Sequence, residues 1–170
     1  DENGWFYLVD RKKDQINAAG YKVWPREVED AIYEHPAVRE VVVDAPETSA
    51  GERRLVAYLV ATGEPPTTSE LHHFLKDRLP QTMIPAAFAF LPALPLSPNG
   101  KVDRRALPAP SQERPRLGAH YVAPRTPVEA ALVAIWAEVI GVERVGVHDN
   151  FFELGGDSIR SVQVAAKAGD

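Results

Sequence analysis

The sequence predicts an α+β domain with a small β-sheet over residues 1–107, followed by an incomplete all-α helical bundle over 124–170. Before residue 107, short apolar runs alternate with segments of helical spacing, whereas only helical spacing follows residue 124. Between the two parts, polar residues surround closely spaced prolines at positions 108, 110, 115, 124 and 127. Such a segment is stiff but buries little, so we expect a linker over 108–123.

In the first domain, apolar, aromatic and β-branched runs predict strands over 5–9, 38–43, 55–60 and 87–91. Pro25 is expected to open a helix with Val28 on its inner face, because proline suits the first helical position. Pro36 is expected to end that helix. A second helix is expected to start at Thr68 or Ser69, with leucines at helical spacing behind it.

In the second domain, Thr126-Pro127-Val128-Glu129 predicts a capping box and a helix that ends at Gly141. A second helix is expected over 158–167. The residues expected on the inner faces of the two helices are Val128, Leu132, Ile135, Trp136 and Val139, and Ile159, Val162 and Ala166. Two short helices cannot bury both faces, so we expect further helices in the intact protein.

Composition excludes several classes of function. The net charge is -5 and no basic stripe is present, which argues against a nucleic-acid surface. No apolar run approaches the roughly 20 residues that span a bilayer. The absence of cysteine excludes disulfides and fits a cytoplasmic protein. His72 and His73 are neighbours on a predicted helix and point in different directions, so we assign no metal site.

Ser158 follows two glycines at the expected start of a helix. Unpaired N–H groups and the positive end of the helix dipole would favour a phosphate on its hydroxyl. The alternative is a loop in which Asp157 or Ser158 only caps the helix. The surrounding segment, Asp149-Asn150-Phe151-Phe152-Glu153-Leu154-Gly155-Gly156-Asp157-Ser158, resembles the 4′-phosphopantetheine attachment motif of carrier domains in nonribosomal peptide synthetases. The resemblance implies that Ser158 bears this cofactor.

Lys101 follows an Asn-Gly turn, which presents it at the tip of a loop. A lysine in a turn can simply be solvated. However, Asn99-Gly100-Lys101-Val102-Asp103-Arg104 resembles the final core motif of adenylate-forming enzymes. The resemblance implies that Lys101 bridges the substrate carboxylate and the ATP α-phosphate during adenylation.

Residues 10–29 resemble the hinge and the following core motif of the same superfamily. The resemblance implies that Arg11 contacts the ribose hydroxyls of the nucleotide and that Lys13 is the hinge. It also implies that Gly20 and Tyr21 belong to a loop that lines the pantetheine tunnel. The alternatives are a solvated charge cluster around Arg11 and a simple hairpin turn at Gly20. Finally, Leu107-Pro108-Ala109-Pro110 resembles a linker motif that docks back on the first domain.

Together these resemblances imply the C-terminal subdomain of an adenylation domain followed by a truncated peptidyl carrier domain. The implied function is activation of a carboxylate, an amino acid by first choice, with ATP and Mg2+, and its transfer as a thioester to the arm on Ser158. The alternatives are a ligase for acyl or aryl acids, favoured by Lys22-Val23-Trp24, and a non-catalytic scaffold.

The implied partners are the N-terminal adenylation subdomain, a phosphopantetheinyl transferase, and condensation or thioesterase domains. The glycine-rich phosphate loop and the acyl pocket of the family have no counterpart in the sequence. We therefore expect the chain to be inactive in adenylation on its own.

Overall fold

A computed structural model describes residues 15–18, 21–47, 51 and 53–169 of the chain. Strands β1 (Ile16–Ala18) and β2 (Tyr21–Val23) pair as a short antiparallel ribbon. Strands β3 (Val38–Asp44), β4 (Val56–Ala61) and β5 (Ala87–Phe90) form a second sheet in the order β3-β4-β5, with β5 parallel to β4. The predicted strand at 5–9 lies outside the described residues; the other three are confirmed.

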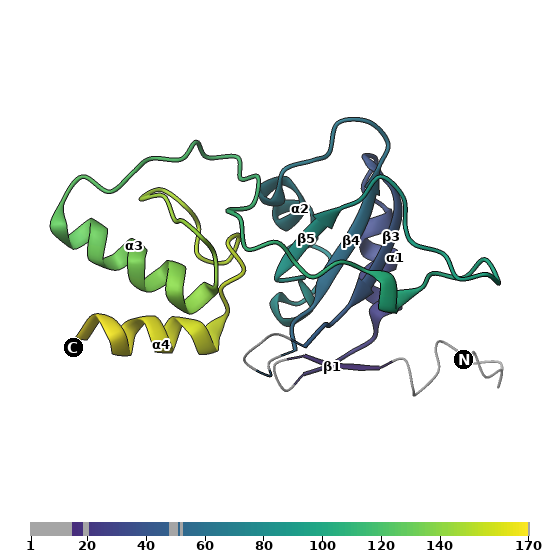
Figure 1. Ribbon diagram of the computed structural model, residues 1–170, viewed down its shortest axis with the longest axis horizontal. Helices are drawn as coiled ribbons and strands as arrows, with labels where there is room; N and C mark the ends of the chain where they lie inside the picture. The colour runs from purple at the N-terminus through teal and green to yellow at the C-terminus, as the bar shows by residue number, and fades with distance from the viewer. Residues whose placement is uncertain (1–14, 19–20, 48–50, 52, 170) are drawn as a thin grey trace.

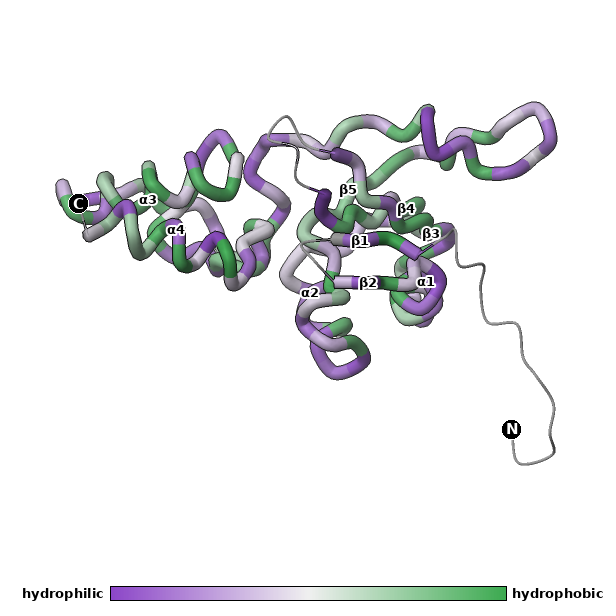
Figure 2. The backbone as a smooth tube through the Cα atoms, turned by 90° about the horizontal axis from the view of Figure 1, so that it is seen from below, coloured by the Kyte–Doolittle hydropathy of each residue, from purple (hydrophilic) through white to green (hydrophobic). Residues whose placement is uncertain are grey.

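Helices α1 (Pro25–Tyr33) and α2 (Thr68–Leu75) lie on the same face of the β3-β4-β5 sheet (Figures 1 and 2). Alternate strand residues face them, so Val43, Ala57 and Leu59 share one core with the buried helical side chains. On the opposite face, Val42 and Tyr58 pack against segment 91–107. Both faces of the small sheet are therefore covered, which explains why β4 is apolar along its length.

Helix α2 starts at Thr68, as predicted, and Thr67 is the residue that caps it. Its hydroxyl accepts from the backbone N–H of Glu70, and the Glu70 carboxylate accepts from the Thr67 N–H at 2.7 Å. This reciprocal pair is a capping box that the sequence analysis missed.

The second domain consists of α3 (Pro127–Ile140), α4 (Ser158–Gly169) and the loop between them. As predicted, Thr126 caps α3 and Gly141 ends it, in the left-handed conformation with φ 83°. The predicted capping box is only half formed. The Glu129 carboxylate accepts from the N–H of Arg125, one residue earlier than expected.

The predicted inner faces of α3 and α4 are largely wrong, although Trp136 does pack against the core as expected. Val128 and Val162 are each 69% exposed, and Leu132 and Ile159 are also exposed. The core of this domain instead consists of Leu117, Ile140, Val145 and Leu154, with Val133, Trp136, Ala137, Val142 and Phe151 packed against it. The loop between the helices, rather than α4, therefore covers the buried face of α3.

The proline-rich segment contacts both domains. Tyr58 donates a 2.9 Å hydrogen bond to the Pro108 carbonyl, and Leu107 packs on the sheet. The expected docking of this motif on the first domain is thus observed. Further along, Leu117 is buried in the helical domain, and Arg114 pairs with Asp149 at 2.6 Å. The segment is fixed at both ends by specific contacts.

Candidate attachment and active sites

Ser158 is the first residue of α4 and its side chain is exposed. The Asp157 carboxylate accepts from the Arg160 N–H at 2.9 Å and so caps the helix. The Ser158 hydroxyl has no hydrogen-bond partner among the described residues. Asp157, and not Ser158, therefore caps the helix. The Ser158 hydroxyl is not used for capping and stays accessible.

The loop before Ser158 is shaped by close packing. The Phe151 ring lies against Gly156, where a Cβ atom would come within 2.4 Å of it. Phe151 also packs edge-to-face on Trp136, with ring centroids 5.0 Å apart. Any larger residue at position 156 would displace this ring from the core. The glycine therefore allows Ser158 to sit directly beside the core of the helical domain.

The same loop touches the first domain. The Ser69 hydroxyl donates to the Glu153 carboxylate, and Arg54 donates to the Gly155 carbonyl at 3.4 Å. At Gly155, where φ is +95°, a Cβ would lie 2.6 Å from the Ala86 carbonyl oxygen. The glycine is thus needed both for the local turn and for the close approach of the two domains.

A cavity of about 310 Å³, which we call the Ser158 cavity, lies between these surfaces. Ser158, Asp157, Ile159 and Phe152 line it from the helical domain. The lining residues of the first domain are Tyr21, Arg54, Leu55, His72, Gln81, Thr82, Ile84, Pro85 and Ala86. The structure therefore places Tyr21 and Ser158, which are far apart in the sequence, on one cavity.

His72 is the polar residue of this cavity that the sequence analysis set aside. Its Nε2 is buried and has no hydrogen-bond partner among the described residues. Burial lowers the pKa of the imidazole, and the nearby Glu153 carboxylate opposes this shift. No sequence signal marked it, because only the fold brings α2 next to the helical domain.

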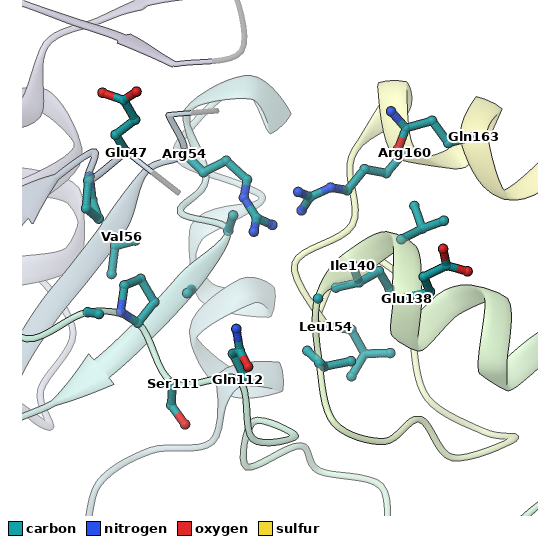
Figure 3. Close-up of a pocket in the computed structure, with 18 of the residues that line it drawn as sticks. Glu47, Arg54, Val56, Ser111, Gln112, Glu138, Ile140, Leu154, Arg160 and Gln163 are labelled. Carbon is teal, nitrogen blue, oxygen red and sulfur yellow. The ribbon is translucent and has the colours of Figure 1, made fainter. Parts of the chain in front are cut away.

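A second, larger cavity of about 640 Å³ opens on the other side of the contact between the domains (Figure 3). Arg54 from the first domain and Arg160 from α4 extend into it from opposite sides. Both guanidinium groups donate to the Gly155 carbonyl at 3.4 Å. The lining also includes Glu47, Glu138 and Lys167, so the charges of this cavity are mixed.

Lys101 is exposed on a hairpin loop over residues 97–101, and this loop lies on the side of the first domain away from α4 (Figure 1). The loop is closed by hydrogen bonds from the Ser97 N–H to the Lys101 carbonyl at 2.7 Å and from the Gly100 N–H to the Ser97 carbonyl at 2.9 Å. Arg104 fixes its base by donating to the Val43 carbonyl and pairing with Glu29 at 3.5 Å. Burial raises the pKa of Glu29, and its hydrogen bond from Val43 and the Arg104 charge oppose this shift.

The predicted site residues thus fall into two separate groups. Ser158 and Tyr21 share a cavity, whereas Lys101 stands apart from both. Arg11, Lys13 and Gly20 lie outside the described residues. Within the described part of the chain, no three His, Asp or Glu side chains gather in a way that could hold a metal ion.

Two family models match this chain in the regions just described. The AMP-binding enzyme C-terminal domain matches residues 27–101, which includes the sheet and ends on Lys101. The phosphopantetheine attachment site matches residues 130–170, which includes α4 and Ser158. One of the linear gramicidin synthase proteins from Brevibacillus parabrevis is 51% identical over 98% of this chain. The chain belongs to the nonribosomal peptide synthetases.

Other relatives agree with this membership. Tyrocidine synthase 3 from Brevibacillus parabrevis is 45% identical over 95% of the chain. In both synthetases the chain spans only 2% of the relative's length. The first domain also makes the chain a member of the adenylate-forming ligase superfamily.

Solved structures also resemble this chain, over nearly all of it in one case and over less than two thirds in the other. A holo four-domain nonribosomal peptide synthetase bound to AMP and glycine matches 91% of this chain, with 33% identity and a TM-score of 0.56; the match is 11% of that protein. The o-succinylbenzoate CoA synthetase of Bacillus subtilis, in complex with its acyl-adenylate intermediate, matches 62% of this chain and 22% of its own length, with 36% identity and a TM-score of 0.55. The first domain is therefore common to synthetases and CoA ligases.

No helix among the described residues is both long and apolar enough to cross a membrane.

Proposed function

We propose that this chain is the mobile part of a synthetase module that activates a carboxylic acid and carries it as a thioester. The acid is an amino acid by first choice, since the relatives over the whole chain are peptide synthetases. The observation that carries the proposal is the accessible Ser158 hydroxyl within a matched phosphopantetheine attachment domain. Asp157 caps the helix, which leaves that hydroxyl to accept the cofactor.

In the first half-reaction, a carboxylate oxygen attacks the α-phosphorus of ATP and pyrophosphate leaves. Lys101 neutralises charge that builds up on the phosphate and the carboxylate, as a positioned cation does in phosphoryl transfer. Arg11 holds the ribose of the nucleotide. ATP and Mg2+ bind mainly to the N-terminal adenylation subdomain, with Lys101 and Arg11 as this chain's contribution.

In the second half-reaction, an arm held on Ser158 would supply the thiol that takes the acyl group from the adenylate, with AMP as the leaving group and the thiol proton passing to solvent. The hairpin loop over residues 97–101 lies on the side of the first domain away from the helical domain (Figure 1), whereas the Ser158 cavity lies between the two domains. A rotation about Lys13 can therefore replace the Lys101 hairpin with the Ser158 cavity at a single active site. Tyr21 guides the arm beside the cavity that it shares with Ser158.

The partners that complete this function are the N-terminal adenylation subdomain and a phosphopantetheinyl transferase. A condensation or thioesterase domain would then receive the thioester. Since the phosphate loop and the acyl pocket belong to the N-terminal subdomain, the 170-residue chain should not catalyse adenylation by itself. The reaction takes place in the cytoplasm, where ATP and coenzyme A are available.

The role of Lys101 is tested by pyrophosphate exchange in a complete synthetase that contains this chain. Lys101→Ala should weaken transition-state stabilisation by about 2.7–4 kcal/mol, the scale for removal of one preorganised charge-stabilising group. Lys76→Ala, which removes a lysine at the end of α2, is the matched control and should leave exchange unchanged. If Lys101→Ala spares exchange and slows only thioester formation, the assignment is wrong.

A further inference from the structure

We propose that the Ser158 cavity is a holding site for the phosphopantetheine arm, formed jointly by the first domain and the helical domain, with His72 as its polar contact. The inference rests on the proposed attachment of the arm to Ser158. It adds a location for the arm while the arm is outside the adenylation active site.

The position of the cavity favours this occupant. Ser158 itself lines the cavity, so an arm on its hydroxyl starts at the edge of the space that it would fill. The volume of about 310 Å³ is at the lower end of the range of about 300–1,000 Å³ for small-molecule sites. Because the arm is covalently attached, its binding is intramolecular, and weak contacts are sufficient to hold it.

The walls of the cavity match the chemistry of the arm. Phosphopantetheine has a branched dimethyl group next to its phosphate, followed by a hydroxyl and two amides. Leu55, Ile84, Pro85 and Ile159 provide apolar surface for the dimethyl group. Gln81 and Thr82 supply polar groups at the same cavity for the hydroxyl and the amides.

His72 provides the observation that points to a ligand. Its buried Nε2 has no partner among the described residues, and a buried polar atom without a partner costs free energy. The Nε2 atom has almost no accessible surface, so the imidazole ring would turn toward the cavity for an arm amide or hydroxyl to supply the missing hydrogen bond. Because burial lowers the pKa of His72, the ring is neutral at physiological pH and offers one donor and one acceptor nitrogen.

The phosphate end of the arm also finds suitable groups. Arg54 lines the cavity and already reaches the Gly155 carbonyl, three residues before Ser158. The first turn of α4 presents backbone N–H groups to the same region. A phosphodiester on Ser158 would thus lie between a guanidinium from one domain and a helix start from the other. The occupied arm would hold the two domains together.

The chain offers a matched control for His72. His73 is the next residue on α2, but it is exposed and lines a different, shallow hollow with His35 and Phe74. Substitution of either histidine removes the same side chain from the same helix. Only the substitution at 72 changes the Ser158 cavity.

The experiment uses the chain after treatment with a phosphopantetheinyl transferase and isotopically labelled coenzyme A. Intact mass identifies the modified fraction, which is then isolated. We expect nuclear Overhauser contacts between the dimethyl group of the arm and the methyl groups of Ile84 and Leu55. We also expect a change in the 15N shift of the His72 ring on modification, with no change at His73.

The contacts should be lost in His72→Ala and retained in His73→Ala. If His72→Ala disturbs the fold, Thr82→Trp, which fills the cavity from an exposed position, should abolish the same contacts. If the modified protein lacks these contacts, or if the contacts persist in Thr82→Trp, the proposed holding site is wrong. The proposed attachment of the arm to Ser158 would still stand. A mass that does not increase would remove the proposed attachment and the holding site together.

Discussion

Asp149 shows how a single buried carboxylate fastens the proline-rich segment to the helical domain. Arg114 donates to its two oxygens at 2.6 and 2.7 Å, and the Gly146 N–H donates at 2.8 Å. Burial alone would raise the pKa of Asp149, but the bonds from Arg114 and Gly146 outweigh it and the pKa is lowered. Folding therefore favours the charged carboxylate.

This ion pair predicts a specific loss of stability in acid. A carboxyl group whose pKa is lower in the folded state stabilises fully above its usual value of 3.8 and progressively less as the pH falls below it. Hydrogen exchange at the Gly146 amide, measured as a function of pH and corrected for intrinsic rates, should show protection falling in that range.

Arg114→Ala provides the control for the acid effect. Without its cation the buried carboxylate is unpaired, so the variant should be destabilised by about 3–5 kcal/mol at neutral pH. Burial then raises the pKa of Asp149, so the variant should lose less protection than the parent protein as the pH falls. Equal protection in the two proteins at every pH would show that the pair contributes nothing.

Ser158 and Lys101 could be singled out from the sequence because each lies in a long local motif. His72, Ser69 and Arg54 could not, because their roles depend on contacts with residues that are more than 80 positions away along the chain. At the residue scale, local motifs identify groups that act on a ligand. They do not identify the groups that surround them.

At the scale of elements, the strands and helices of the first domain follow their sequence patterns closely. β4 is buried on both faces and reads as a continuous apolar run, and Pro25 starts α1 as expected. The parallel pairing of β4 with β5 had no sequence signal, because parallel neighbours are joined through a crossover, which here contains α2.

α3 shows why the inner face of the helical domain was predicted wrongly. Its 14 residues are apolar on nearly every side, so helical periodicity does not select one face. The residues that pack against the helix determine which face is buried. Leu117 from the linker and Val145 and Leu154 from the loop cover Ile140 and its neighbours.

The corrected face of α3 predicts the effect of two matched truncations in this chain. Ile140 is 2% exposed, so Ile140→Ala should lower the free energy of unfolding by about 2–5 kcal/mol. Val128 is 69% exposed, so Val128→Ala should change it by no more than about 0.5 kcal/mol. Chemical denaturation monitored by tryptophan fluorescence measures both. If Val128→Ala lowered the free energy of unfolding more than Ile140→Ala, the inner face predicted from the sequence would be the correct one.

At the scale of the whole molecule, few polar contacts hold the two domains against each other. The Ser69 hydroxyl donates to Glu153 and also accepts from the Gly118 N–H at 2.9 Å, so it joins α2, the linker and the carrier loop. The Ser69 hydroxyl therefore contributes directly to the docking of the two domains.

Ser69→Ala should therefore loosen the docking without unfolding either domain. We expect the 15N relaxation rates of the two domains to match in the unsubstituted protein and to diverge in the variant. Ser161→Ala removes a hydroxyl that bonds only within α4, to the Ser158 carbonyl, and should leave the rates matched. Matched rates in Ser69→Ala would mean that the apolar contacts around Gly155 and Ala86 are sufficient for docking.

The central claim is that Ser158 carries the phosphopantetheine arm, and mass together with thiol content tests it most directly. The sequence contains no cysteine, so any thiol in the modified protein belongs to the arm. Because the described part of the helical domain leaves Ile159 and Val162 of α4 exposed, a phosphopantetheinyl transferase should modify the chain only in part. A longer synthetase protein that contains the chain should be modified fully.

In both proteins we expect one added phosphopantetheine and one thiol per modified chain, localised by peptide mass to Ser158. Ser161→Ala should retain the modification and Ser158→Ala should abolish it. Modification that persists in Ser158→Ala, or that is absent from the longer protein with intact Ser158, would contradict the account.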